Sequence, residues 1–183
     1  MAATKTNKTT ARTKDPPRQK LPKVSKKLVV GWFTFTCSED SSIMLIELMN
    51  DHFFDWKDKI EFRNFRLLKR MNIAGPFDVA FIEGAISTKK DKERLKGIRT
   101  VSKKLVAVGA CAVTGMPSAQ RNSFDAAKKA EIKPILDRFG HLDKVIAVHE
   151  VVPVDDSVPG CPMDTNIFLE LLDKYMKEFG VTK

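Results

Sequence analysis

The stretch "KLVVGWFTFTCSEDSSIMLIELMN", residues 27–50, contains the clearest indication of how this chain folds. Its first half is an apolar run rich in β-branched and aromatic residues, which is typical of a strand buried on both faces. Its second half has apolar residues near helical spacing, at Ile43, Leu45, Ile46, Leu48 and Met49. Cys37 stands at the junction. A buried strand that leads directly into an amphipathic helix predicts an α/β fold.

The same alternation continues to the end of the chain. Further strands are expected over residues 60–68, 77–86, 104–113 and 144–154. Helices are expected over 41–54, 87–104, 126–139 and 164–179, the second with Ser87 or Thr88 as its N-cap and the third with Pro134 as a possible break. Strands and helices that alternate at this spacing predict a layered α/β domain with a largely parallel sheet.

The charge of the chain is concentrated at its N-terminus. Residues 1–27 contain nine Lys or Arg and one Asp, so they carry +8 of the net charge of +9. We therefore divide the chain into a basic tail, 1–26, expected to be disordered or bound to a partner, and an α/β domain, 27–183. The tail lacks the interleaved aromatic residues of a nucleic-acid-binding arm, so no nucleic-acid partner is expected.

No apolar run approaches the ~20 residues that a membrane span requires. The N-terminus also lacks an apolar signal segment. These features predict a cytoplasmic protein without a membrane span.

Three cysteines, Cys37, Cys111 and Cys161, each lie at or just beyond the end of a predicted strand. Parallel sheets form their sites at the carboxyl ends of strands, so the three thiols are expected to meet at one edge. An odd number of cysteines argues against a set of disulfides, although each thiol could simply be a small buried apolar group. Zinc held by three Cys and one Asp is possible, but the chain lacks a C-x-x-C pair. Distant thiolates suit an iron–sulfur cluster equally well.

Four segments carry a resemblance to a known family. "GWFTFTCSED", "FIEGAI", "GACAVTGMPSAQRN" and "VPGCPMDTNIF" resemble the signature regions of the small subunit of nickel–iron hydrogenases and, more distantly, the 20 kDa subunit of respiratory complex I. The resemblance implies a flavodoxin-like three-layer domain that holds one proximal 4Fe–4S cluster. It implies that Cys37, Cys111 and Cys161 are cluster ligands.

Asp40 occupies the position of the family's second cysteine. Hydrogenases that reduce the deazaflavin coenzyme F420 resemble this chain in having a C-x-x-D motif, so Asp40 is expected to be the fourth ligand through a carboxylate oxygen. The alternative is a vacant corner and a three-iron or labile cluster, and Glu39 is a spare candidate. For an oxygen ligand, the sign of the change in cluster potential does not follow from the sequence.

Four further residues are candidates near the cluster. Gly84, Gly109 and Gly160 are expected to let the backbone approach it closely. Glu83 could serve in proton movement, lie at a subunit interface or hydrogen-bond the cluster loop; the structural alternative is an acid that stabilises a helix N-terminus.

The resemblance implies an electron-transfer small subunit, the non-catalytic subunit of an oxidoreductase complex. Its partners would be a large subunit with the nickel–iron centre and a further electron-transfer subunit or a ferredoxin. One alternative is a cluster-bearing subunit of a complex I-like or hydrogenase-related complex without hydrogenase activity. The other is a structural or zinc-binding module without a cluster.

Overall fold

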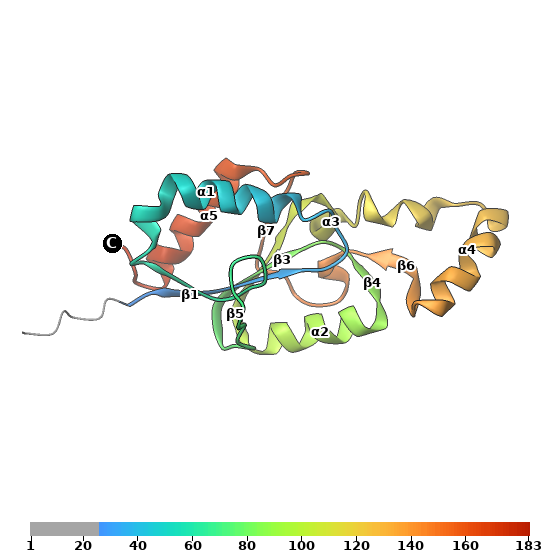
Figure 1. Cartoon of the computed structure of the whole chain (residues 1–183), viewed down its shortest axis with the longest axis horizontal. Coiled ribbons are helices and arrows are strands. Elements are labelled where there is room, and N and C mark those ends of the chain that lie inside the picture. Colours follow the sequence, from blue (N-terminus) through green and yellow to red (C-terminus); the bar gives the residue numbers. More distant parts are fainter. Residues whose placement is uncertain (1–25) are drawn as a thin grey trace, which may run out of the picture.

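The computed structural model describes residues 26–183, and a five-stranded parallel sheet forms their centre (Figure 1). The predicted tail, 1–26, lies outside this part of the chain except for Lys26. The strands follow the order β2-β1-β3-β5-β7. Their bounds are β1 Leu28–Thr34, β2 Ile60–Phe65, β3 Phe77–Glu83, β5 Ser102–Val108 and β7 Asp156–Val158. All neighbours in this sheet pair in parallel, which confirms the predicted fold class.

Helices cover both faces of the sheet. Helices α1, Asp40–Trp56, and α5, Thr165–Glu178, lie on one face, and α2, Lys89–Thr100, lies on the other (Figure 1). Every residue of the central strand β3 is buried, because side chains on both of its faces meet a helical layer. Thr88 caps α2, as predicted, by accepting a 3.0 Å hydrogen bond from the backbone N–H of Asp91.

An aromatic cluster fixes α1 and α5 to the first face. Trp32 in β1 is only 2% exposed, and its ring centroid lies 5.6–6.0 Å from three neighbouring rings, those of Phe65, Phe81 and Phe168. Phe168 belongs to α5, so the C-terminal helix packs directly on the centre of the sheet. Rings at such distances add favourable edge contacts to the free energy of burial.

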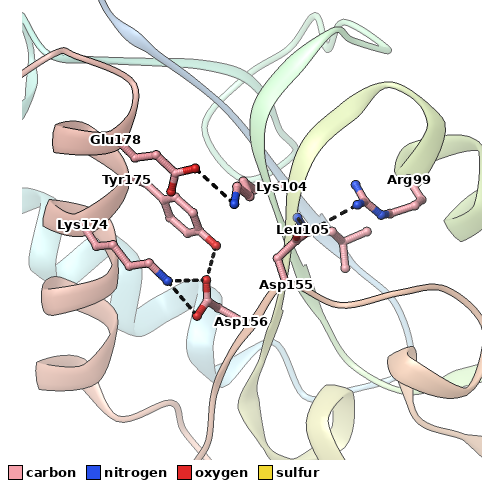
Figure 2. Close-up of polar contacts among 8 residues, drawn as sticks. All are labelled: Arg99, Lys104, Leu105, Asp155, Asp156, Lys174, Tyr175 and Glu178. Carbon is pink, nitrogen blue, oxygen red and sulfur yellow. Dashed lines mark hydrogen bonds and ion pairs between the residues drawn. The ribbon is translucent and has the colours of Figure 1, made fainter.

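Polar contacts join α5 to strands β5 and β7 beside it (Figure 2). Asp156 in β7 accepts hydrogen bonds from Tyr175 and from Lys174, the latter at 2.8 Å. Burial alone would raise the pKa of the Asp156 carboxyl group, but these two donors outweigh burial and hold the pKa below its usual value. Lys104 in β5 pairs with Glu178 at 3.1 Å. These contacts tie the C-terminal half of α5 to β5 and β7.

Two predicted strands differ from the structure, and β7 was not predicted. The run 104–113 was expected to be one strand, but β5 stops at Val108 and the short helix α3, Gly109–Thr114, follows. The run 144–154 was expected to join the main sheet. Instead β6, His141–Ile146, pairs antiparallel with β4, Ile86–Thr88, in a separate two-stranded sheet. A 3-10 turn, η2, Val148–Glu150, then leads toward β7.

Helix α4, Ala126–Arg138, projects from the end of the molecule that carries β6 (Figure 1). None of its residues is buried, and its packing is against β6. Pro134 lies inside one continuous helix and does not divide it. A 3-10 helix, η1, Ser118–Ser123, precedes α4.

Within residues 26–183, no helix combines the length and the apolar character needed to cross a bilayer.

Candidate functional site

The three cysteines gather in one hollow at the carboxyl end of the parallel sheet. Its walls include all three thiols, Asp40 and the backbone of three glycines. Cys37 follows β1, Cys111 lies in α3 directly after β5, and Cys161 follows β7. The hollow has about 240 Å³ of space free of atoms, part of it open to solvent. The structure therefore brings together residues that are up to 124 positions apart, as the strand-end rule predicts.

The three thiols differ in exposure. Cys161 is exposed, Cys37 is half-buried and Cys111 is 8% exposed. The sulfur of Cys111 lies 3.2 Å from Ser118 Oγ, and that hydroxyl donates a hydrogen bond to the carbonyl of Thr36, next to Cys37. Ser118 thus links the loops of two cysteines.

Burial, supported by the nearby Glu83 carboxylate, raises the pKa of Cys37 to about 12. Its thiol is therefore protonated at neutral pH. Metals bind the thiolate, so a positive centre in the hollow would have to displace this proton.

Asp40 and Glu39 face different spaces. Asp40 lines the cysteine hollow and accepts a 2.6 Å hydrogen bond from Ser38 Oγ. Glu39 has a left-handed backbone, φ 64°, and lines a second hollow with Thr34 and Arg66. Of the two acids, Asp40 is the one beside the three thiols.

Glu83 is 3% exposed and reaches the start of helix α1. Its carboxylate accepts hydrogen bonds from Ser41 N at 2.9 Å and from Ser42 Oγ at 2.5 Å. Burial raises the pKa of Glu83, and these hydrogen bonds oppose the rise. Glu83 does bind the N-terminus of a helix, as the structural alternative in the sequence analysis stated. That helix is α1, whose Ser42 lies 41 residues before Glu83, and not the helix that follows Glu83 in the sequence.

The three predicted glycines all line the hollow, and each has a positive φ. At Gly84, φ is +91° and an added Cβ would lie 2.9 Å from backbone atoms of Phe35 and Thr36. At Gly160, φ is +106° and the added Cβ would lie 2.5 Å from the carbonyl oxygen of Pro162. Only glycine fits such positions without displacing backbone.

Ser41 and Ser42 are functional candidates that the sequence analysis missed. Besides donating to Glu83, Ser41 accepts at its Oγ a 3.2 Å hydrogen bond from Met163 N, in the loop of Cys161. Ser42 Oγ accepts a 2.7 Å hydrogen bond from Trp32 Nε1. The sequence signal was present: two serines sit in a helix's first turn directly after the cysteine motif, where hydroxyls bind backbone or nearby acids.

A comparison with protein families shows to which family this chain belongs. A family model described as "NADH ubiquinone oxidoreductase, 20 Kd subunit" matches residues 37–175. The chain belongs to this family. The resemblance noted in the four cysteine and glycine segments is thereby confirmed.

Curated relatives of this 20 kDa subunit-family member are hydrogenase subunits. The delta subunit of sulfhydrogenase 2 from Pyrococcus furiosus is 30% identical over 148 residues, which are 79% of this chain and 60% of the relative. The delta subunit of the NAD-reducing hydrogenase HoxS from Cupriavidus necator is 34% identical over 111 residues, 52% of this chain and 53% of the relative. The chain thus matches between half and two thirds of the length of these relatives.

Solved structures share the fold. A chain in the crystal structure of an NAD+-reducing NiFe-hydrogenase in the H2-reduced state superposes with a TM-score of 0.69 at 23% identity, over 84% of this chain and 93% of that one. A chain of the actinobacterial-type NiFe-hydrogenase from Ralstonia eutropha superposes with a TM-score of 0.59 at 16% identity, over 87% and 56%.

The residues of this family member suit an iron–sulfur cluster in their chemistry. Three cysteines, the two acids Asp40 and Glu83, and three glycines line a single hollow. Within residues 26–183, no three His, Cys, Asp or Glu side chains are placed so as to share one metal ion. A cubane cluster offers corners that are well separated, so its ligands need not converge on one point.

Proposed function

We propose that this chain is the electron-transfer small subunit of a nickel–iron hydrogenase, and that it relays electrons through one proximal 4Fe–4S cluster. The observation that carries the proposal is the meeting of Cys37, Cys111, Cys161 and Asp40 around one hollow. The hydrogenase relatives support the choice of complex.

The proposed ligands are the three thiolates and the Asp40 carboxylate. Glu39 is the weaker candidate because it lines a different hollow. Asp40 is the stronger candidate because it lines the same hollow as the three cysteines. We do not assign a vacant fourth corner, because Asp40 supplies a carboxyl group at the same hollow.

When bound, the cluster would supply one-electron transfer. The chain's own residues hold its surroundings. Gly84, Gly109 and Gly160 keep side chains out of the hollow, and Glu83 anchors the first turn of α1, which carries Asp40. In this arrangement Glu83 acts as a positioning residue, and its carboxylate lines the hollow as well.

The catalytic nickel–iron centre is assigned to a partner large subunit, because the chain has only three cysteines and all of them line this hollow. The electron acceptor is assigned to a further electron-transfer subunit or a ferredoxin. We place the complex in the cytoplasm.

Anaerobic purification tests the proposal directly. We expect about four iron and four sulfide per chain and an EPR signal of a reduced cluster. A colourless protein with stoichiometric zinc and no iron would refute the proposal and leave the zinc-binding module.

The description of the family model favours one second candidate, a cluster-bearing subunit of a complex I-like redox complex without hydrogenase activity. The two candidates differ in the partner. A co-purifying large subunit that contains nickel and supports hydrogen-dependent dye reduction indicates a hydrogenase. A nickel-free partner without this activity indicates the second candidate.

A further inference from the structure

A buried wall separates the cysteine hollow from a larger hollow that also borders the start of helix α1. The larger hollow has about 590 Å³ of space free of atoms, part of it open to solvent, and Trp32 and Ser42 line it. Glu83 lines the cysteine hollow. The residues at the start of α1 line two hollows: the N-cap Glu39 and Ser42 line the larger hollow, whereas Asp40 and Ser41 line the cysteine hollow.

Three side chains close this wall through continuous hydrogen bonds. Trp32 Nε1 donates to Ser42 Oγ at 2.7 Å, and Ser42 Oγ donates to Glu83 Oε2 at 2.5 Å. The exposed fractions are 2% for Trp32, 0% for Ser42 and 3% for Glu83. Water that fills the larger hollow therefore does not pass between these residues. The single hydroxyl of Ser42 joins the indole to the carboxylate.

We propose that Ser42 is a positioning residue that keeps this wall closed, and that the closed wall shields the cysteine hollow from the water of the larger hollow. Removal of its hydroxyl takes away the 2.7 Å acceptor of the Trp32 N–H and the 2.5 Å donor to Glu83 Oε2. Buried polar groups without partners attract water, so the change favours hydration of the wall. The 2.9 Å bond from Ser41 N–H still joins Glu83 to the helix.

Shielding matters for a redox centre. The reduction potential of an iron–sulfur cluster depends on its exposure to solvent and on nearby hydrogen bonds. Water stabilises the more negatively charged reduced state, so an opened wall is expected to raise the midpoint potential. It also gives a chelator a second route to the iron.

The test uses the full-length Ser42→Ala variant beside Ser102→Ala. Ser102 is a matched control, because it is also a buried serine, and its hydroxyl donates a 2.7 Å hydrogen bond to the Ile98 carbonyl, away from the wall. Trp32→Phe is a second variant that removes the indole N–H and keeps a large ring. Ser42→Cys restores a group of similar size that can donate weakly, and it should recover part of the effect.

The first measurement is amide hydrogen exchange of residues 39–46 in the chain without iron. We expect exchange in Ser42→Ala to be about tenfold faster than in the wild type, from the loss of a hydrogen bond to a charged group. Ser102→Ala should match the wild type in this segment. Unchanged exchange in both Ser42→Ala and Trp32→Phe would overturn the proposed wall.

The second measurement is made on the iron-loaded protein. We expect a higher midpoint potential and faster iron loss to a chelator in Ser42→Ala than in Ser102→Ala. Faster exchange with an unchanged potential and unchanged iron loss would overturn the shielding role. Only this second measurement depends on the proposed function: a wild-type protein that binds no iron refutes the electron relay, and the exchange data still decide whether Ser42 closes the wall.

Discussion

Replacement of Gly84 by alanine should damage both the fold and the cysteine hollow. Gly84 has φ +91°, where an L-residue costs roughly 1–2 kcal/mol. The new Cβ would also lie 2.9 Å from backbone atoms of Phe35 and Thr36, which cannot rotate aside as a flexible side chain can. Overpacking of this kind costs about 1–3 kcal/mol. The two costs together reduce the free energy of unfolding by roughly 2–5 kcal/mol, a large share of the ~5–15 kcal/mol typical of a domain.

Urea unfolding of the metal-free chain, followed by circular dichroism, measures this cost. Gly97→Ala is the matched control, because Gly97 lies inside α2 and an added Cβ there has nothing within 4 Å. That control should be more stable than the wild type by roughly 0.5–1 kcal/mol. Since Phe35 and Thr36 directly precede Cys37, Gly84→Ala should also lower the iron content. An unfolding midpoint equal to that of the wild type would refute the reasoning from backbone contact.

Three further changes test other parts of the molecule. Asp40→Ala should yield a labile or three-iron cluster and Asp40→Cys an intact one with a shifted potential; iron content and EPR signals unchanged in Asp40→Ala would show that this carboxylate is not a ligand. The folded-state pKa of Asp156 is lowered, so the stability it contributes is present above the unfolded pKa of about 3.9 and is lost as the pH falls through the lower folded pKa. The stability difference between wild type and Asp156→Asn should therefore vanish in acid, and a difference that persists at the lowest pH would contradict this. Alkylation of the folded metal-free chain, read by mass spectrometry, should modify exposed Cys161 before buried Cys111, and the reverse order would argue against the described exposures.

Strands β1, β3 and β5 could be predicted from the sequence because most of their residues are apolar and buried, whereas the three-residue strand β7 was not predicted. Apolar runs rich in β-branched residues are recognised from local pattern, and a three-residue strand that contains Asp and Ser is not. Where an apolar run continues beyond the end of a strand, the pattern does not show where the strand ends. The run 104–113 contains both β5 and the start of α3, and the chain turns at Gly109, whose φ is +81°. The glycine was the available sign of that turn.

Pairing between distant segments could not be predicted in the same way. Strand β6 has a strand-like sequence, yet it pairs with the three-residue β4 and leaves the main sheet without it. Nothing in the local composition of β6 distinguishes an antiparallel partner in a small sheet from a place in the main one. The choice depends on the long-range contacts of the whole domain.

The cysteines of the candidate site could be named from the sequence, whereas the hydrogen bonds that hold the surrounding residues in place could not. Cys37, Cys111 and Cys161 stand out because the chain has only three cysteines and each lies near a strand end. That they ligate a cluster stays a prediction. The bond from Ser42 to Glu83 joins residues 41 positions apart, and the two serines at the helix start indicate that polar partners are near without indicating which acid they bind.

The separation of the thiols along the chain has a consequence for assembly. Cys37 follows the first strand of the main sheet and Cys161 follows the last, so no shorter part of the chain brings all three together. During synthesis, Cys37 can meet Cys161 only after β7 has left the ribosome and joined the edge of the main sheet. Whatever binds all three thiols can therefore be captured only after strand β7 has joined the sheet and brought Cys161 to its edge.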